Sequence, residues 1–170
     1  MTLLFAVSLT AQETESAADR AAINAIVKQY VAKITARDYA AAAAIFHAPA
    51  SKAAEDRSSL HEDLLVVHAE LGGIGSVHRF DDDRDYLAGV GIGAGTLPYW
   101  DRHPELATRE IGATYEKGDR GVVRFSFGRI DDRWVLRKVN YEVLVTTPER
   151  LEKMKQFLSR FMRLPDAKKK

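Results

Sequence analysis

The chain has 170 residues, of which 46% are hydrophobic and 29% are charged, a composition typical of one globular domain that can bury its own core. It contains no cysteine, which excludes disulfides and thiolate metal sites. A formal net charge of +1 is too balanced for a dedicated nucleic-acid-binding protein, so we expect no nucleic-acid partner.

The first twelve residues differ from the rest of the chain. Leu3–Leu9 is apolar, small residues follow, and the chain becomes polar at Glu13. This order is typical of the end of a secretory signal peptide, although the basic residues that usually precede it are missing. We therefore expect a bacterial protein in the periplasm or outside the cell; the alternative is an apolar arm docked on a cytoplasmic domain. No run is long enough to predict an integral membrane segment.

One domain, residues 13–165, should begin with two helices. Ser16 is placed to cap the first helix, and apolar residues recur at helical spacing at Ile23, Ile26, Val27, Tyr30, Val31 and Ile34. Asp38 is placed to cap a short, alanine-rich second helix that reaches Phe46 and ends before Pro49.

A third helix is expected from about residue 51 or 58 to Leu71, where Gly72 and Gly73 end it. His61 and His68 lie seven residues apart on it, about 10.5 Å along the helix axis, which is too far for both to bind one metal ion. We therefore expect no metal site and no cofactor. His68 and His78 flank the glycine turn, and we expect both to be half-exposed, with a place at a pocket mouth as the alternative.

The periodicity then changes to that of strands. A short strand is expected at Ser76–Phe80, a charged turn at residues 81–85, and a weak strand at Tyr86–Ala94. Glycines alternate from Gly89 to Gly95 without the spacing of a dinucleotide fingerprint. They indicate a flexible loop or a strand with one face free of side chains.

Three clearer strands follow, around residues 111–115, 123–127 and 134–145, joined by tight turns. They predict an antiparallel meander. In a regular strand Trp134 and Tyr141 point to opposite faces, so both can face inward only if a bulge lies between them.

The segment Tyr99–His103, which contains Trp100 and Asp101, follows Pro98 in an irregular stretch. Aromatic side chains beside an acid and two bases suit a loop that contacts a polar ligand, or one that is held to the domain by a buried Trp100.

A last helix should begin at Thr147 and Pro148. Its apolar side is formed by Leu151, Met154, Leu158, Phe161 and Met162, and its other side is basic. The apolar side indicates packing on the sheet; the alternative is a surface for a partner or an anionic membrane. Residues 166–170 form a basic tail.

The segment Gln29-Tyr-Val-Ala-Lys-Ile-Thr-Ala-Arg-Asp-Tyr-Ala-Ala-Ala-Ala-Ala-Ile-Phe46 resembles the first two helices of nuclear transport factor 2-like proteins, which include ketosteroid isomerases and polyketide cyclases. The resemblance covers residues 19 to 46 well and the strands from 110 to 144 more loosely. It implies an α+β fold in which N-terminal helices pack on a curved antiparallel sheet, a cone-shaped barrel, here with an added C-terminal helix. One fold of this kind hosts many activities.

Within that resemblance, Tyr30 stands where the isomerases carry the tyrosine that binds the substrate oxyanion. Gly121 stands where they carry a second donor, an aspartic acid, and the acids nearest to their general base are Glu55 and Asp56. Since one of three functional positions is kept, isomerase chemistry is not the leading hypothesis. A core tyrosine with a bonded hydroxyl is the alternative for Tyr30.

The leading hypothesis is a non-catalytic domain that binds a small hydrophobic ligand between the sheet and the first and third helices. Its candidate ligand-binding residues are Tyr30, His68, Trp100, Asp101, Arg109, Trp134 and Tyr141. The alternatives are an isomerase, cyclase or hydratase for a small carbonyl compound, with Tyr30 as oxyanion donor, and a homodimeric protein-interaction module.

Overall fold

The computed structural model describes four stretches of the chain, residues 15–48, 53–78, 87–94 and 106–161. Several features expected from the sequence lie outside the described residues: the apolar segment 1–12, Pro49, the charged turn 81–85, the cluster 99–103 with Trp100 and Asp101, and the tail 166–170.

The helices begin and end close to where their capping residues predict. They are α1 (Ala17–Thr35), α2 (Tyr39–Ile45), α3 (Ala53–Leu71) and α4 (Pro148–Phe161). The side chains of Ser16 and Asp38 each accept a backbone N–H of the following turn, which confirms both as N-caps. Gly72 ends α3 with a φ of +78°, a left-handed conformation that glycine adopts without strain.

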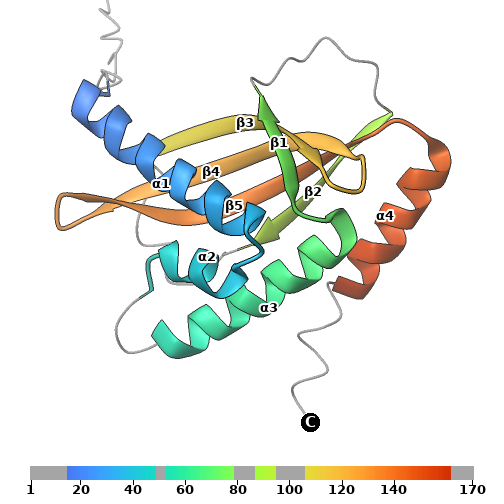
Figure 1. The fold of residues 1–170 in the computed structure, drawn as a ribbon, viewed down its shortest axis with the longest axis horizontal. Coiled ribbons are helices and arrows are strands. Elements are labelled where there is room, and N and C mark those ends of the chain that lie inside the picture. The colour runs from blue at the N-terminus through green and yellow to red at the C-terminus, as the bar shows by residue number, and fades with distance from the viewer. Residues whose placement is uncertain (1–14, 49–52, 79–86, 95–105, 162–170) are drawn as a thin grey trace, which may run out of the picture.

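The strands form one five-stranded sheet, and every neighbouring pair is antiparallel. They are β1 (Ile74–His78), β2 (Ala88–Ala94), β3 (Ala107–Tyr115), β4 (Arg120–Ile130) and β5 (Arg133–Val145), in the spatial order β1-β3-β4-β5-β2. The expected meander of β3, β4 and β5 is confirmed. The sheet is open, with β1 and β2 at its edges, so the strands do not close into a barrel (Figure 1).

Two strands differ in detail from the sequence prediction. β1 begins at Ile74, two residues earlier than expected, because Glu116 donates its backbone N–H to the Gly73 carbonyl and draws the chain into pairing directly after the helix. The glycine-rich segment is a strand along its whole described length, since Ala88 to Ala94 pairs with Val145 to Val139 of β5.

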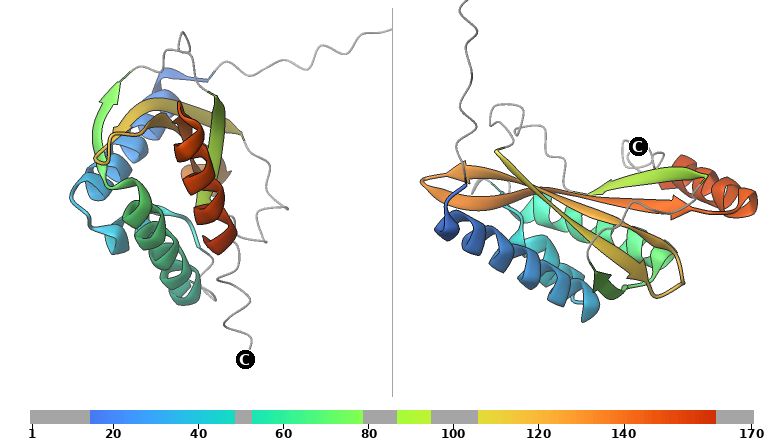
Figure 2. Two further views of the ribbon diagram at one scale, coloured as in Figure 1. Left: turned by 90° about the vertical axis from the view of Figure 1, so that its right-hand side faces the viewer. Right: turned by 90° about the horizontal axis from the view of Figure 1, so that it is seen from above.

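Helices α1, α2 and α3 lie on one side of the sheet, and α4 lies beside the end of β5 (Figure 2). The core fills the space between this side of the sheet and the helices. It includes Ile23, Ile34, Leu64, Val67, Val123, Phe125, Phe127, Val139, Val143 and Met154. The apolar stripes predicted for α1 and α3 therefore face the sheet, as their spacing requires.

A β-bulge interrupts the pairing of β4 with β5. Ser126 pairs with Lys138, but the next residue, Phe127, pairs with Leu136, so Arg137 is an extra residue on β5. An extra residue reverses the alternation of side chains beyond it.

Because of the bulge, Trp134 and Tyr141 lie on the same face of the sheet. Tyr141 is buried beneath the helices, and the Trp134 indole donates to Asp19 of α1. In a regular strand these two side chains would point to opposite faces, and the one extra residue brings them to the same face.

Candidate functional site

Three of the residues singled out from the sequence meet in the interior. Tyr30 comes from α1, His68 from α3 and Tyr141 from β5. The hydroxyls of Tyr30 and Tyr141 share a short hydrogen bond, and His68 Nε2 lies 3.2 Å from the Tyr141 hydroxyl. Both tyrosines are fully buried and His68 is 4% exposed. Tyr30 is therefore a core tyrosine with a bonded hydroxyl, and the expectation of a half-exposed His68 is wrong.

The direction of each hydrogen bond among Tyr30, Tyr141 and His68 follows from the contact of His68 with the Gly72 carbonyl. His68 Nδ1 lies 2.7 Å from the carbonyl oxygen of Gly72, which only accepts, so Nδ1 carries the proton. In a neutral imidazole Nε2 is then an acceptor, and the Tyr141 hydroxyl donates to it. The Tyr141 oxygen accepts in turn from Tyr30. The order of donation is Tyr30 to Tyr141 to His68 to the Gly72 carbonyl.

Burial keeps the three hydrogen-bonded side chains, Tyr30, Tyr141 and His68, neutral near pH 7. Desolvation lowers the pKa of His68, and the hydrogen bond to Gly72 and the charge of Glu116 oppose this only in part. Desolvation also raises the pKa of Tyr30 and of Tyr141 well above the usual tyrosine range. Neutral groups in this order satisfy one another's hydrogen-bonding capacity without a buried charge.

Aromatic rings fill the space around this hydrogen-bonded chain. The rings of Phe46 and Phe125 form T-shaped pairs with the Tyr30 ring at centroid distances of 5.8 and 5.6 Å, and Tyr39 stacks on His68 at 5.2 Å. The space between the sheet and helices α1 and α3, where we expected the ligand pocket, is therefore occupied by the protein's own side chains.

Trp134 and Arg109 lie away from the hydrogen-bonded Tyr30, Tyr141 and His68, near the start of α1. The Trp134 indole Nε1 donates to Asp19 Oδ1 at 2.7 Å, and the Arg129 guanidinium lies 5.3 Å from the centre of the indole. The hydrogen bond from Trp134, together with that from the Ser16 hydroxyl, holds the pKa of Asp19 below its ordinary value.

Arg109 of β3 forms an ion pair with Glu15, the residue that precedes the N-cap of α1. It also donates from Nη1 to the carbonyl oxygen of Thr108 at 2.7 Å. The contacts of Arg109 therefore hold the start of α1 to the sheet.

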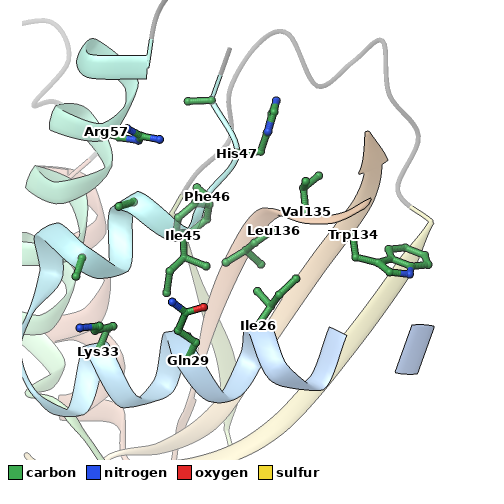
Figure 3. Close-up of a pocket in the computed structure, with 13 residues that line it drawn as sticks. Ile26, Gln29, Lys33, Ile45, Phe46, His47, Arg57, Trp134, Val135 and Leu136 are labelled. Atoms are coloured by element: carbon green, nitrogen blue, oxygen red, sulfur yellow. The ribbon is translucent and has the colours of Figure 1, made fainter. Parts of the chain in front are cut away.

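A groove with a volume of about 600 Å³ opens beside Trp134 (Figure 3). It lies between α1, α2 and the first residues of β5, and it is lined by Ile26, Gln29, Lys33, Ala41, Ala44, Ile45, Phe46, His47, Ala48, Arg57, Trp134, Val135 and Leu136. Its volume falls within the range of roughly 300–1,000 Å³ that is usual for small-molecule sites.

Tertiary contacts made after the end of α2 give the groove its shape. Helix α2 ends at Ile45, and Phe46 is extended, with φ −66° and ψ 140°. Phe46 forms an isolated parallel bridge to Leu136, and His47 donates its backbone N–H to the Leu136 carbonyl at 3.2 Å. These bonds hold the chain against β5 in the part of that strand that β2 does not reach, since β2 pairs only as far as Val139.

The groove was missed by sequence reasoning, apart from Trp134. Its other lining residues come from three helices, the segment after α2 and strand β5. Those on the helices and the strand have an ordinary local explanation, as part of an amphipathic or alanine-rich helix or of an alternating strand. In the sequence, Phe46 and His47 at the end of α2 are simply an apolar residue followed by a polar one. Nothing local indicates that Phe46 bridges to a strand ninety residues later.

The positions compared with the isomerases are not arranged for that chemistry in the described residues. A Cβ added at Gly121 would overlap the carbonyl oxygen of Glu142, so a second donor side chain has no space there without a shift of the backbone. Glu55 is exposed and Asp56 is partly exposed in the first turn of α3, whereas Tyr30 is buried in the core.

Among the described residues, no group of three or more His, Asp or Glu side chains is placed to hold a metal ion. No helix in the described part of the chain has the length and apolar character needed to cross a membrane.

Comparison with other proteins gives no further guide to the site. No protein-family model matches the chain, and neither a curated protein nor a solved structure is similar to it at a significant level. The conclusions about function therefore depend on the residues and geometry described above.

Proposed function

We propose that this chain is a non-catalytic domain that binds a small, mainly apolar molecule in the groove between α1, α2 and β5. The observation that carries the proposal is an open groove of about 600 Å³ whose lining combines apolar side chains with the polar groups of Gln29, Lys33, His47 and Arg57. Ile26, Ile45, Val135 and Leu136 supply the wall. This combination is the usual make-up of small-molecule sites.

Two features support binding rather than catalysis. The Tyr30 and Tyr141 hydroxyls and His68 are bonded to one another in the core, whereas a general acid or base needs to come within hydrogen-bond reach of the substrate. The groove is lined by Gln29, Lys33 and Arg57, which suit recognition, and by His47, its one imidazole among the described residues.

We also propose that the domain is of the nuclear transport factor 2-like type. Support comes from the resemblance of residues 29–46 and from helices packed on one side of a twisted antiparallel sheet. Within this proposal the ligand lies beside the sheet, next to α2, and not between the sheet and α3.

A blocking substitution tests the binding site. Ala44 is exposed and lines the groove, so Ala44→Trp should fill the space with little effect on folding. Ala69→Trp, at an exposed position near the end of α3, is the matched control.

The measurement is a thermal-shift screen against apolar acids, sterols and polyketide-like carbonyl compounds. A ligand at a hundred times its dissociation constant adds about 2.7 kcal/mol to the free energy of unfolding. We expect a hit that stabilises the wild type and Ala69→Trp but not Ala44→Trp. A hit that stabilises all three proteins equally would place the ligand elsewhere.

A further inference from the structure

The two charged side chains that line the groove in the described part of the chain are both basic. Lys33 and Arg57 line it, and no Asp or Glu is among its lining residues. Lys33 already has a partner, since its Nζ lies 3.3 Å from Asp38 Oδ2. Arg57 is exposed, and no carboxylate of the described residues forms an ion pair with it. The groove therefore offers one guanidinium whose charge is not balanced within the described chain.

The groove has a basic side chain at one end and an aromatic side chain at the other. Arg57 of α3 extends toward the groove on the side where His47 lies, whereas Trp134 lies at the opposite end (Figure 3). Between them are the side chains of Ile45, Val135 and Leu136. The Trp134 ring is fixed by its hydrogen bond to Asp19 and its contact with Arg129.

We infer that the natural ligand is a monomeric amphiphile with a carboxylate head group, held with the head group at Arg57 and the apolar chain directed toward Trp134. This inference rests on the proposed function and adds the chemical class and the orientation of the ligand. A guanidinium presents a planar pair of donors that matches a carboxylate, and apolar surface along the groove suits an alkyl chain.

The charge requirement is tested with decanoate and decanol, which share a chain and differ in the head group. Wild-type protein should bind decanoate about threefold to fivefold more tightly than decanol, the modest gain expected from an exposed ion pair. Arg57→Gln should abolish this preference and leave the affinity for decanol unchanged. Lys28→Gln, an exposed position on α1 outside the groove, should keep the preference.

The orientation is tested by tryptophan fluorescence. The chain has two tryptophans, so a Trp100→Phe background leaves Trp134 as the only tryptophan, which is excited selectively at wavelengths that tyrosine does not absorb. Bromine quenches indole fluorescence on close contact. At saturation, 10-bromodecanoate should quench Trp134 more strongly than 2-bromodecanoate, because the end of the alkyl chain lies at Trp134.

Each outcome separates the inference from the proposed function. If decanol binds in the groove as tightly as decanoate, the carboxylate inference is wrong while the binding site stands. Stronger quenching by 2-bromodecanoate would reverse the orientation and remove Arg57 as the head-group site. If neither compound binds and only vesicles of phosphatidylglycerol do, the ligand is a membrane surface and the inference fails. Absence of all binding, with Ala44→Trp behaving as the wild type, would overturn both proposals.

Discussion

The Tyr141 hydroxyl is the residue-scale feature with the most consequences, because it both accepts from Tyr30 and donates to His68. Tyr141→Phe leaves a buried donor and a buried acceptor without partners, and each such group costs about 1–3 kcal/mol. We expect a loss of about 2–6 kcal/mol in the free energy of unfolding. Tyr30→Phe keeps the bond from Tyr141 to His68, so it should cost only about 1 kcal/mol. Urea denaturation measures both values, and the reverse order would contradict the hydrogen-bond directions.

Tyr115 provides the matched control for these substitutions. Its side chain is 1% exposed, and its hydroxyl has no hydrogen-bond partner in the described structure. Since the buried hydroxyl gains nothing there, Tyr115→Phe should leave the free energy of unfolding unchanged or raise it slightly.

His68 makes stability depend on pH. Desolvation holds the pKa of folded His68 below its ordinary value of 6.5, which the unfolded chain should show. Below about pH 6.5 the unfolded state binds more protons than the folded state, so the free energy of unfolding should decrease as the pH falls. His68→Asn should remove this decrease. His61→Asn, on the same helix but outside the hydrogen-bonded chain, is the control.

At the scale of elements, α4 belongs to the core. Arg150 donates to Asp119 of the β3–β4 turn at 3.0 Å and to Glu70 of α3 at 2.8 Å. Met154 is fully buried and Phe157 is 7% exposed. The helix therefore joins α3 to one end of the sheet, and the described part of its apolar side, from Leu151 to Leu158, packs against the core.

Met154→Ala tests this role of α4. Removing a fully buried methionine side chain should lower the free energy of unfolding by about 2–5 kcal/mol. Lys153→Ala, at the exposed neighbouring position, should change it by less than about 0.5 kcal/mol. If Met154→Ala is as stable as the wild type in chemical denaturation, α4 is instead a surface for a partner.

At the scale of the whole molecule, the core and the groove occupy different places in the described structure. Tyr30, Tyr141 and Phe125 fill the middle of the core, whereas the groove lies where β5 extends beyond β2. A site at such a boundary between elements is shaped by how they are placed relative to one another.

Local chemistry in the sequence was enough to predict most of the elements, although it left the glycine-rich strand β2 and the start of α3 open. Ser16, Asp38 and Gly72 mark helix ends by the hydrogen bonds or backbone angles their residue types favour. Alternating apolar residues predicted the meander of β3, β4 and β5, and apolar residues at helical spacing predicted which faces of the helices lie in the core. These features depend on residues a few positions apart, so a single sequence contains them.

Tertiary structure alone decided the pairing of β2 with β5, the burial of His68, and the position of Trp134 beside the groove. The first depends on contacts about fifty residues apart, and the second on a partner seventy-three residues away. The third depends on the extra residue Arg137, which turns Trp134 to the helix side. Long-range pairing and a one-residue bulge leave no periodic signal along the chain, so the elements were predictable whereas the groove between them was not.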